Sequence, residues 1–301
     1  MTIILRTRYI CVLLFIFLSF SSVLAKDKRA LLIGISTYPI VENNKDASWN
    51  SIHGANDINL ITPQLKKQGF RITSLIEKNA TANNIRKAFI RLEKECKQGD
   101  LVYIHFSMHG QPVEDTSRDE SDGWDEALVP YDAYKKPIVG KYVGQNHILD
   151  DELYSSLLSI RRKIGKEGFV YIVVDACHAG EFQRSEDEND DGEIFVRGTD
   201  SAFSMTNKKF VPRINASSSF KIKQESGHAE ICFIEACRSY QTNCEIKQNN
   251  TYYGPLSFYI SQLLSTTTLT EDCKWLEILD KNMRADKRLS RQNMVIETSI
   301  K

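Results

Sequence analysis

The feature that most constrains the fold is the alternation of short, continuous apolar runs with segments of helical periodicity. Six runs have the length and composition of strands, at 29–34, 70–76, 101–107, 169–175, 231–236 and, more weakly, 293–298. Helical spacing follows Asn56 and Thr81, which we expect to be N-caps, and fills 150–164, 255–264 and 273–283. Continuous apolar strands joined by helices are typical of a mostly parallel sheet covered on both faces. The sequence therefore predicts an α/β fold with about six strands.

The N-terminus has the pattern of a secretory leader. Arg6 and Arg8 precede an apolar run at 9–20, and small residues follow at 23–25. The run has 12 residues, fewer than the ~20 that a membrane-spanning helix needs. We expect a signal peptide at 1–25, cleavage after Ala25, and a secreted or periplasmic protein with no membrane span after cleavage.

The remainder of the chain suits one large α/β domain or two small ones. The sequence has 39 basic and 39 acidic residues, and the leader removes two Arg and no acid, which leaves a net charge of about −2. This balance gives no reason to expect a nucleic-acid or membrane partner. Six cysteines follow the leader without the paired spacing of a zinc site, and all but Cys177 are best interpreted as structural thiols.

One candidate base and one candidate nucleophile follow two of the predicted strands. His109 comes after 101–107, and Cys177 comes after 169–175. Sites of parallel sheets form at the carboxyl ends of strands, so we expect an imidazole that activates a thiol. Gly110 allows close approach of a substrate carbonyl, and its N–H could hold an oxyanion together with that of Cys177. His178 is a poor base, because neighbouring side chains diverge. The alternative is two ordinary residues at strand ends.

The motifs around this pair resemble those of a known family. The strings S-x-H-G, D-G-W-D-E-A-L-V-P-Y-D and V-V-D-A-C-H-A-G look like caspase-fold (clan CD) cysteine peptidases, closest to metacaspases and their bacterial relatives. The strings R-A-L-L-I-G-I-S-T-Y, G-A-N-D-I, E-A-C-R-S-Y-Q-T-N-C-E and M-V-I-E-T extend the resemblance over roughly 29–298. It implies a caspase-like three-layer α/β/α sandwich and a catalytic dyad of His109 and Cys177.

The resemblance also implies the substrate pocket. Asp57 and Asp175 match the acidic floor of the S1 pocket in metacaspases, with Ser107 close by. Two carboxylates at strand ends would select an Arg or Lys side chain and reject an Asp. We therefore expect protein or peptide substrates cleaved after basic residues. Taken alone, Asp57 could simply be an acid that favours a helix N-terminus.

No cofactor is required for this chemistry, and calcium is an optional ligand. Asp150 and Asp151 match a paired-acid position of the metacaspases that bind it, although both would also suit an N-cap. The stretch 187–198 fits the first half of a calcium loop, but Gly198 stands where a bidentate Glu is expected. A solvated acidic loop is the alternative for both.

The resemblance divides the domain at 26–301 into a large-subunit-like part (26–182), a charged linker loop (183–228) and a small-subunit-like part (229–301). A peptidase that prefers basic residues could process itself in this linker. The candidates are its basic residues, among which the sequence does not choose: Arg184, Arg197, Lys208, Lys209, Arg213, Lys221 and Lys223.

Three functions are compatible with these observations. The first is an active, exported Arg/Lys-specific cysteine endopeptidase. The second is a catalytically silent caspase-like binding or regulatory module, which the intact His109, Gly110 and Cys177 argue against. The third, a metal-binding protein that uses Cys177 and His178, lacks the ligand spacing. The sequence does not indicate the oligomeric state.

Overall fold

The centre of the molecule is a six-stranded sheet. The computed structural model describes residues 26–300, apart from 119, 121, 179–192, 200, 212–221 and 223–224. The strand order is β11 (Val295–Thr298), β8 (Glu230–Glu235), β7 (Phe169–Asp175), β3 (Leu101–Ser107), β1 (Lys28–Gly34) and β2 (Phe70–Ile76). All neighbours are parallel except β11, which pairs antiparallel with β8 at the edge. The predicted α/β fold with a mostly parallel sheet is confirmed.

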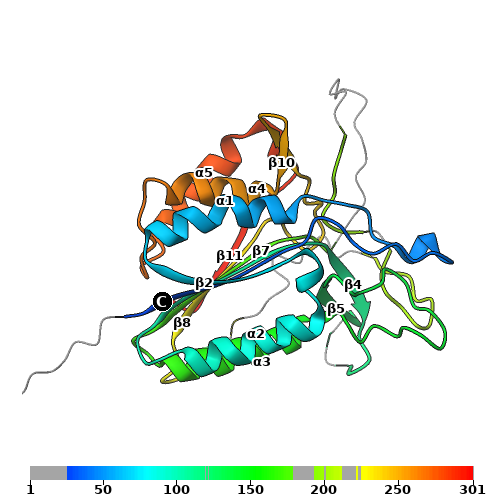
Figure 1. The fold of residues 1–301 in the computed structure, drawn as a ribbon, viewed down its shortest axis with the longest axis horizontal. Coiled ribbons are helices and arrows are strands. Elements are labelled where there is room, and N and C mark those ends of the chain that lie inside the picture. The colour runs from blue at the N-terminus through cyan, green and yellow to red at the C-terminus, as the bar shows by residue number, and fades with distance from the viewer. Residues whose placement is uncertain are drawn as a thin grey trace, which may run out of the picture.

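Helices cover both faces of the sheet (Figure 1). One face carries α1 (Gly54–Lys67), α4 (Pro255–Leu264) and α5 (Trp275–Ala285), and the other carries α2 (Ala82–Glu95) and α3 (Asp150–Ile164). Alternate strand residues supply the two cores: Tyr103 packs on the first side, and Ile104 on the second. This is the three-layer arrangement that continuous apolar strands require, because neither face of the sheet meets water.

The helix starts differ in part from the sequence prediction. Thr81 is the N-cap of α2, and its side chain accepts a hydrogen bond from the Asn84 N–H, as predicted. The prediction of Asn56 as N-cap was wrong, because α1 begins two residues earlier, after His53. Helix α5 begins at Trp275 rather than at residue 273, since Cys273 has a left-handed φ of 56° that a helix cannot contain.

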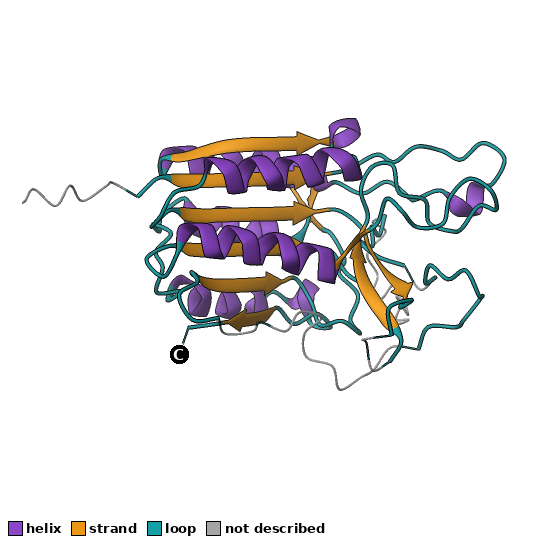
Figure 2. Ribbon diagram, turned by 90° about the horizontal axis from the view of Figure 1, so that it is seen from below, coloured by secondary structure: helices purple, strands orange, loops and turns teal. Residues whose placement is uncertain are grey.

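Two stretches outside the predicted strands and helices contain further strands. One holds β4 (Gly110–Glu114) and β5 (Trp124–Leu128), which form a three-stranded antiparallel sheet with β6 (Ile148–Leu149). The other holds the hairpin of β9 (Ile246–Gln248) and β10 (Thr251–Tyr253). Short 3₁₀ helices lie at Lys45–Ala47, Glu77–Asn79 and Lys287–Leu289. Figure 2 shows the parallel strands ending on the side where β4 and β5 lie.

Two further findings concern the whole described part of the chain. No helix within residues 26–300, as far as they are described, is long and apolar enough to cross a membrane. The six cysteines of this part are all free thiols, and Cys177 is buried. The predicted leader at 1–25 lies outside the described residues.

Candidate active site

The register of two central strands brings His109 and Cys177 to the same edge of the sheet. Strands β3 and β7 are parallel neighbours, and Ser107 stands opposite Asp175 at their carboxyl ends. His109 and Cys177 each lie two positions beyond that pair, and both are buried. The two residues predicted as base and nucleophile therefore follow neighbouring hydrogen-bonded strands at the same edge of the sheet.

His109 is held in an orientation that leaves one ring nitrogen available. Its Nε2 lies 2.9 Å from the carbonyl oxygen of Asn50, and its ring stacks on Trp49 at a centroid distance of 4.8 Å. Its Nδ1 is buried and has no hydrogen-bond partner among the described residues. Burial lowers the pKa of His109 to about 4, because a buried imidazole disfavours its charged form. The neutral ring that donates from Nε2 has its basic lone pair on Nδ1.

The backbone N–H groups beside the two members of the pair share one acceptor, as the predicted oxyanion hole would require. The N–H of Gly110 and the N–H of Cys177 donate to one carbonyl oxygen, that of Arg197, over 3.0 and 3.1 Å. Position 110 must be glycine, because a Cβ there would lie 2.6 Å from the Cys177 carbonyl oxygen. The two donors therefore converge on the carbonyl group of a residue from the predicted linker loop.

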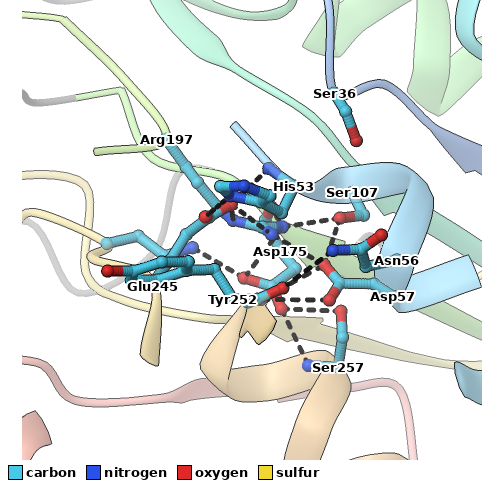
Figure 3. A network of polar contacts seen from close by, with 12 residues as sticks. Ser36, His53, Asn56, Asp57, Ser107, Asp175, Arg197, Glu245, Tyr252 and Ser257 are labelled. Atoms are coloured by element: carbon cyan, nitrogen blue, oxygen red, sulfur yellow. Dashed lines mark hydrogen bonds and ion pairs between the residues drawn. The ribbon is translucent and has the colours of Figure 1, made fainter. Parts of the chain in front are cut away.

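The side chain of Arg197 fills the pocket beside this hole, and none of it is exposed (Figure 3). Its Nη2 lies 2.8 Å from Asp57 Oδ2 and 2.7 Å from Glu245 Oε1, and Nη1 lies 3.8 Å from Asp175 Oδ1. Burial alone would lower the pKa of Arg197, but the negative charges of these three acids outweigh it and raise the pKa. The pocket therefore holds a guanidinium against three acids.

Asp57 forms the floor of this pocket from the first turn of α1. Its carboxylate accepts hydrogen bonds from Ser107 Oγ (2.5 Å) and from the Gly254 N–H (3.0 Å). Ser107 Oγ in turn accepts a hydrogen bond from Arg197 Nη1 over 2.5 Å. Burial raises the pKa of Asp57 to about 7, and the charge of Arg197 offsets only part of that effect. The structure thus brings Asp57 and Ser107 together around one cation.

The carboxylate of Asp175 lies 3.8 Å from the guanidinium and makes no hydrogen bond to it. Its Oδ1 accepts a hydrogen bond from Asn243 Nδ2, and its Oδ2 accepts from both the N–H and the hydroxyl of Ser257, all over 2.7 Å. These bonds orient the carboxylate, while its backbone oxygen accepts from Arg197 Nη1 over 3.2 Å. All three residues of the predicted S1 pocket, Asp57, Asp175 and Ser107, therefore surround Arg197.

Glu245 is a pocket residue that the sequence analysis missed. Its Oε1 accepts hydrogen bonds from both Nε (3.1 Å) and Nη2 (2.7 Å) of Arg197. Burial acts to raise the pKa of Glu245, but the Arg197 charge and the hydrogen bonds from His53 outweigh it, so the pKa is lowered. Glu245 is the last residue of the motif E-A-C-R-S-Y-Q-T-N-C-E. That motif was the one available signal, because Glu245 lies ten residues after Glu235, the last residue of β8.

The backbone around Arg197 pairs with the chain that carries Glu245. The Arg197 N–H donates to the Asn243 carbonyl over 3.0 Å, and the Glu245 N–H donates to the Phe195 carbonyl over 2.9 Å. Val196 and Cys244 form the antiparallel bridge between these bonds. An extended peptide that adds a strand to an exposed edge in this way is a common mode of peptide recognition.

The chain beyond Arg197 continues along β4. The Phe203 N–H donates to the Pro112 carbonyl (2.8 Å), and the Phe203 carbonyl accepts from the Glu114 N–H (2.9 Å). The Phe203 ring is buried and packs against Tyr142 and His147 at centroid distances of 5.6 and 4.9 Å. The segment 195–203 is thus anchored on both sides of the Arg197 carbonyl.

The predicted metal residues lie apart from the pocket, at the start of α3. Helix α3 begins at Asp150 with Leu149 as its N-cap and no side-chain cap bond, so the capping interpretation was wrong. Asp150 Oδ1 is buried without a hydrogen-bond partner in the described chain, and burial raises the pKa of Asp150 to about 7. Nevertheless, the described residues contain no group of three His, Cys, Asp or Glu side chains placed to hold a metal ion. The expectation of calcium at Asp150 and Asp151 therefore stays a prediction, and within the described residues Cys177 and His178 belong to no such group.

The second calcium candidate falls mostly outside the described structure. Of the stretch 187–198, residues 187–192 are not described, and the remainder lies in the active site around Arg197.

His178 is buried, which lowers its pKa to about 4. It lines a small cavity with Glu126, Asp150 and Glu235.

Comparison with known proteins agrees with this geometry. Residues 27–298 match the family model of the caspase domain. The chain belongs to the caspase domain family. It is a member of a family of cysteine peptidases, as its motifs predicted.

The similar curated proteins include metacaspases of plants and fungi. The chain is 33% identical over 163 residues to Metacaspase-2 of Arabidopsis thaliana, a match that covers 51% of this chain and 35% of that protein. It is 30% identical over 164 residues to Metacaspase-1B of Aspergillus fumigatus, with the same two coverages. The match thus spans about a third of the length of these curated relatives. A crystal structure of a Geobacter sulfurreducens protein, 19% identical, superposes with a TM-score of 0.59 over 90% of this chain and 93% of that one, which supports the fold.

Proposed function

We propose that this caspase domain protein is a cysteine endopeptidase that cleaves after Arg, and after Lys less well. The observation that carries the proposal is the position of Arg197. Its guanidinium is surrounded by Asp57, Asp175 and Glu245, while its carbonyl oxygen accepts from both donors of the oxyanion hole. A substrate residue before a cleaved bond needs both interactions at once.

The proposed reaction uses the two residues at the strand ends. Nδ1 of neutral His109 takes the proton of the Cys177 thiol, and the thiolate attacks the carbonyl carbon of the bound residue. The N–H groups of Gly110 and Cys177 stabilise the resulting oxyanion. His109 then gives its proton to the leaving amide nitrogen as the C–N bond breaks. Water, deprotonated by His109, hydrolyses the thioester and regenerates the thiol.

The preference for Arg over Lys follows from Glu245. Its two hydrogen bonds go to Nε and Nη2 of Arg197, and the terminal ammonium of a Lys side chain cannot donate both from that geometry. An Asp side chain would face three carboxylates in a pocket closed to water, so cleavage after Asp is not expected.

We further propose that the enzyme processes itself at the bond between Arg197 and Gly198. Among the basic residues of the linker considered from the sequence, Arg197 has its carbonyl in the oxyanion hole and its side chain in the acidic pocket.

We also propose that the protein is exported, to the periplasm or out of the cell. This proposal rests on the leader pattern at 1–25 alone.

Fluorogenic peptides that end in Arg, Lys or Asp test the proposed function. The wild-type protein, Cys177→Ala and the matched control Cys96→Ala, a buried thiol at the end of α2, would be compared in reductant. We expect cleavage in the order Arg, Lys, Asp, with a loss of about a thousandfold or more in Cys177→Ala. Preferred cleavage after Asp would contradict the pocket assignment. An absence of turnover with every peptide would favour a catalytically silent binding module.

A further inference from the structure

Phe195 makes a second side-chain contact with the enzyme, two residues before Arg197. Its ring meets His53 edge-on at a centroid distance of 4.5 Å and Tyr252 at 4.8 Å with an interplanar angle of 66°. His53 and Tyr252 also stack on each other, at 5.2 Å and 23°. Edge-on and offset contacts of this kind are the favourable geometries for aromatic rings.

The two receiving rings are held by elements that also form the acidic pocket. His53 precedes α1, and both its N–H and its Nδ1 contact the Glu245 carboxylate, at 2.7 and 2.5 Å. Tyr252 lies in β10, where its carbonyl accepts a hydrogen bond from the Asn56 side chain over 3.2 Å. The Lys247 ammonium lies 5.5 Å from the centre of the Tyr252 ring. Both residues are therefore held by contacts other than those with Phe195.

The backbone fixes which substrate residue reaches these rings. The Phe195 carbonyl accepts from the Glu245 N–H, and the Arg197 N–H donates to the Asn243 carbonyl, so 195–197 is extended along 243–245. Side chains alternate along an extended segment, so positions 195 and 197 share one face. Any peptide whose Arg occupies the pocket in this register presents its third residue before the cleaved bond to His53 and Tyr252.

We propose that His53 and Tyr252 form a subsite for an aromatic side chain at this third position (P3), so that the preferred substrates have the pattern aromatic, any residue, Arg. The inference rests on the proposed peptidase function and names the substrate class of that site. The subsite consists of two rings that stack on each other and both meet the Phe195 ring edge-on, and so it favours a flat ring over a branched apolar chain. A small or acidic residue at this position would lose both ring contacts.

A peptide series in which only P3 changes tests the inference. The series is X-Val-Arg-reporter with X as Phe, Leu, Ala or Asp. We expect kcat/KM for the Phe peptide to exceed that for the Ala peptide roughly tenfold, mainly through KM. Leu should fall between the two, and Asp at or below Ala. Because every peptide ends in Arg, this ratio is independent of the acidic pocket.

Two variants of Tyr252 connect the preference to the subsite. In Tyr252→Ala the Phe-to-Ala ratio should fall to within about twofold of one, whereas the matched control Tyr252→Phe keeps the ring and the ratio. Equal cleavage of the Phe and Ala peptides by the wild type would overturn the subsite and leave the Arg peptidase standing. A ratio unchanged in Tyr252→Ala would also overturn it. Failure to cleave every Arg peptide would instead overturn the proposed function, and this inference with it.

Discussion

The three acids around Arg197 act on it in different ways. Asp57 lies 2.8 Å from one guanidinium nitrogen, Asp175 is held by its own hydrogen bonds at 3.8 Å, and Glu245 accepts from two nitrogens. The first two supply negative charge, which Lys and Arg both satisfy. Glu245 supplies the fixed hydrogen-bond geometry that only Arg satisfies.

Glu245→Gln is therefore expected to change specificity as well as rate. We expect kcat/KM for Arg peptides to fall about 10- to 100-fold, the effect of losing a charge-assisted hydrogen-bonded pair. Cleavage after Lys should fall less, so the Arg-to-Lys ratio should narrow. The matched control is Glu167→Gln, an exposed acid just before the start of β7, at the opposite end of that strand from Asp175, which should leave both rates unchanged. An equal loss for both peptides would show that Glu245 acts through charge alone.

The pH dependence of cleavage should follow Asp57 rather than His109. Burial raises the pKa of Asp57 to about 7 and lowers that of His109 to about 4. As pH falls through 7, Asp57 takes up a proton and ceases to balance the substrate cation. His109 stays neutral until pH is near 4. Glu245, whose pKa is lowered, stays ionised throughout.

We therefore expect kcat for an Arg peptide, which reports the site with a guanidinium bound, to rise with pH between about 5 and 8, with a midpoint near 7. Asp57→Asn should be much less active, and its profile over this range should be flat. Asp46→Asn, at an exposed acid, serves as the control and should reproduce the wild-type curve. A wild-type midpoint near 4 would show instead that protonation of His109 causes the loss of activity at low pH.

Most of the individual site residues could be predicted from the sequence. His109, Cys177, Asp57 and Asp175 stand in recognisable motifs beside strand ends. Glu245 and the choice of Arg197 could not be predicted, because both depend on how a polar segment without apolar periodicity folds back across the strand ends. No local sequence pattern indicates that this segment crosses the strand ends.

At the scale of elements, the position of α1 decides where Asp57 lies. The helix starts against the strand ends, and a Cβ on its first residue, Gly54, would lie 2.2 Å from the Ser107 carbonyl oxygen and 2.6 Å from that of Ile35. The close approach places Asp57 within hydrogen-bond distance of Ser107. A larger residue at position 54 must move the helix away from the sheet.

Gly54→Ala is expected to lower both stability and activity. Overpacking of this kind typically costs about 1–3 kcal/mol, and displacement of Asp57 should raise KM for Arg peptides more than it lowers kcat. Thermal unfolding and steady-state kinetics measure the two effects. Ser51→Ala, an exposed position just before the helix, should change neither. A fully active and stable Gly54→Ala would show that the helix can shift without loss.

The elements themselves were predictable to different degrees. The six strands of the main sheet and the five helices follow from long apolar periodicities, which burial on two faces imposes. Strands β4, β5, β9 and β10 could not be predicted in this way, because they are short and partly polar. They are stabilised by pairing near the site, β4 with β5 and β9 with β10. These are the elements that contact the linker segment, through Glu114 in β4 and Tyr252 in β10.

At the scale of the whole molecule, the chain passes through its own active site. Phe195 and Arg197 pair with the chain at 243–245, and Phe203 is anchored along β4. An intact chain in this arrangement fills the pocket that a substrate needs. Cleavage between Arg197 and Gly198 would allow the first part to leave, whereas the Phe203 anchor would still hold the second.

The most direct test of this account is the N-terminal sequence of the fragments that the purified protein forms in reductant. We predict a new N-terminus that begins Gly198-Thr199-Asp200, present in the wild type and absent in Cys177→Ala. Arg197→Gln should lose this fragment, and Arg197→Lys should form it more slowly. Cleavage at other linker residues with the bond after Arg197 left intact, or the same fragment from Cys177→Ala, would contradict the account.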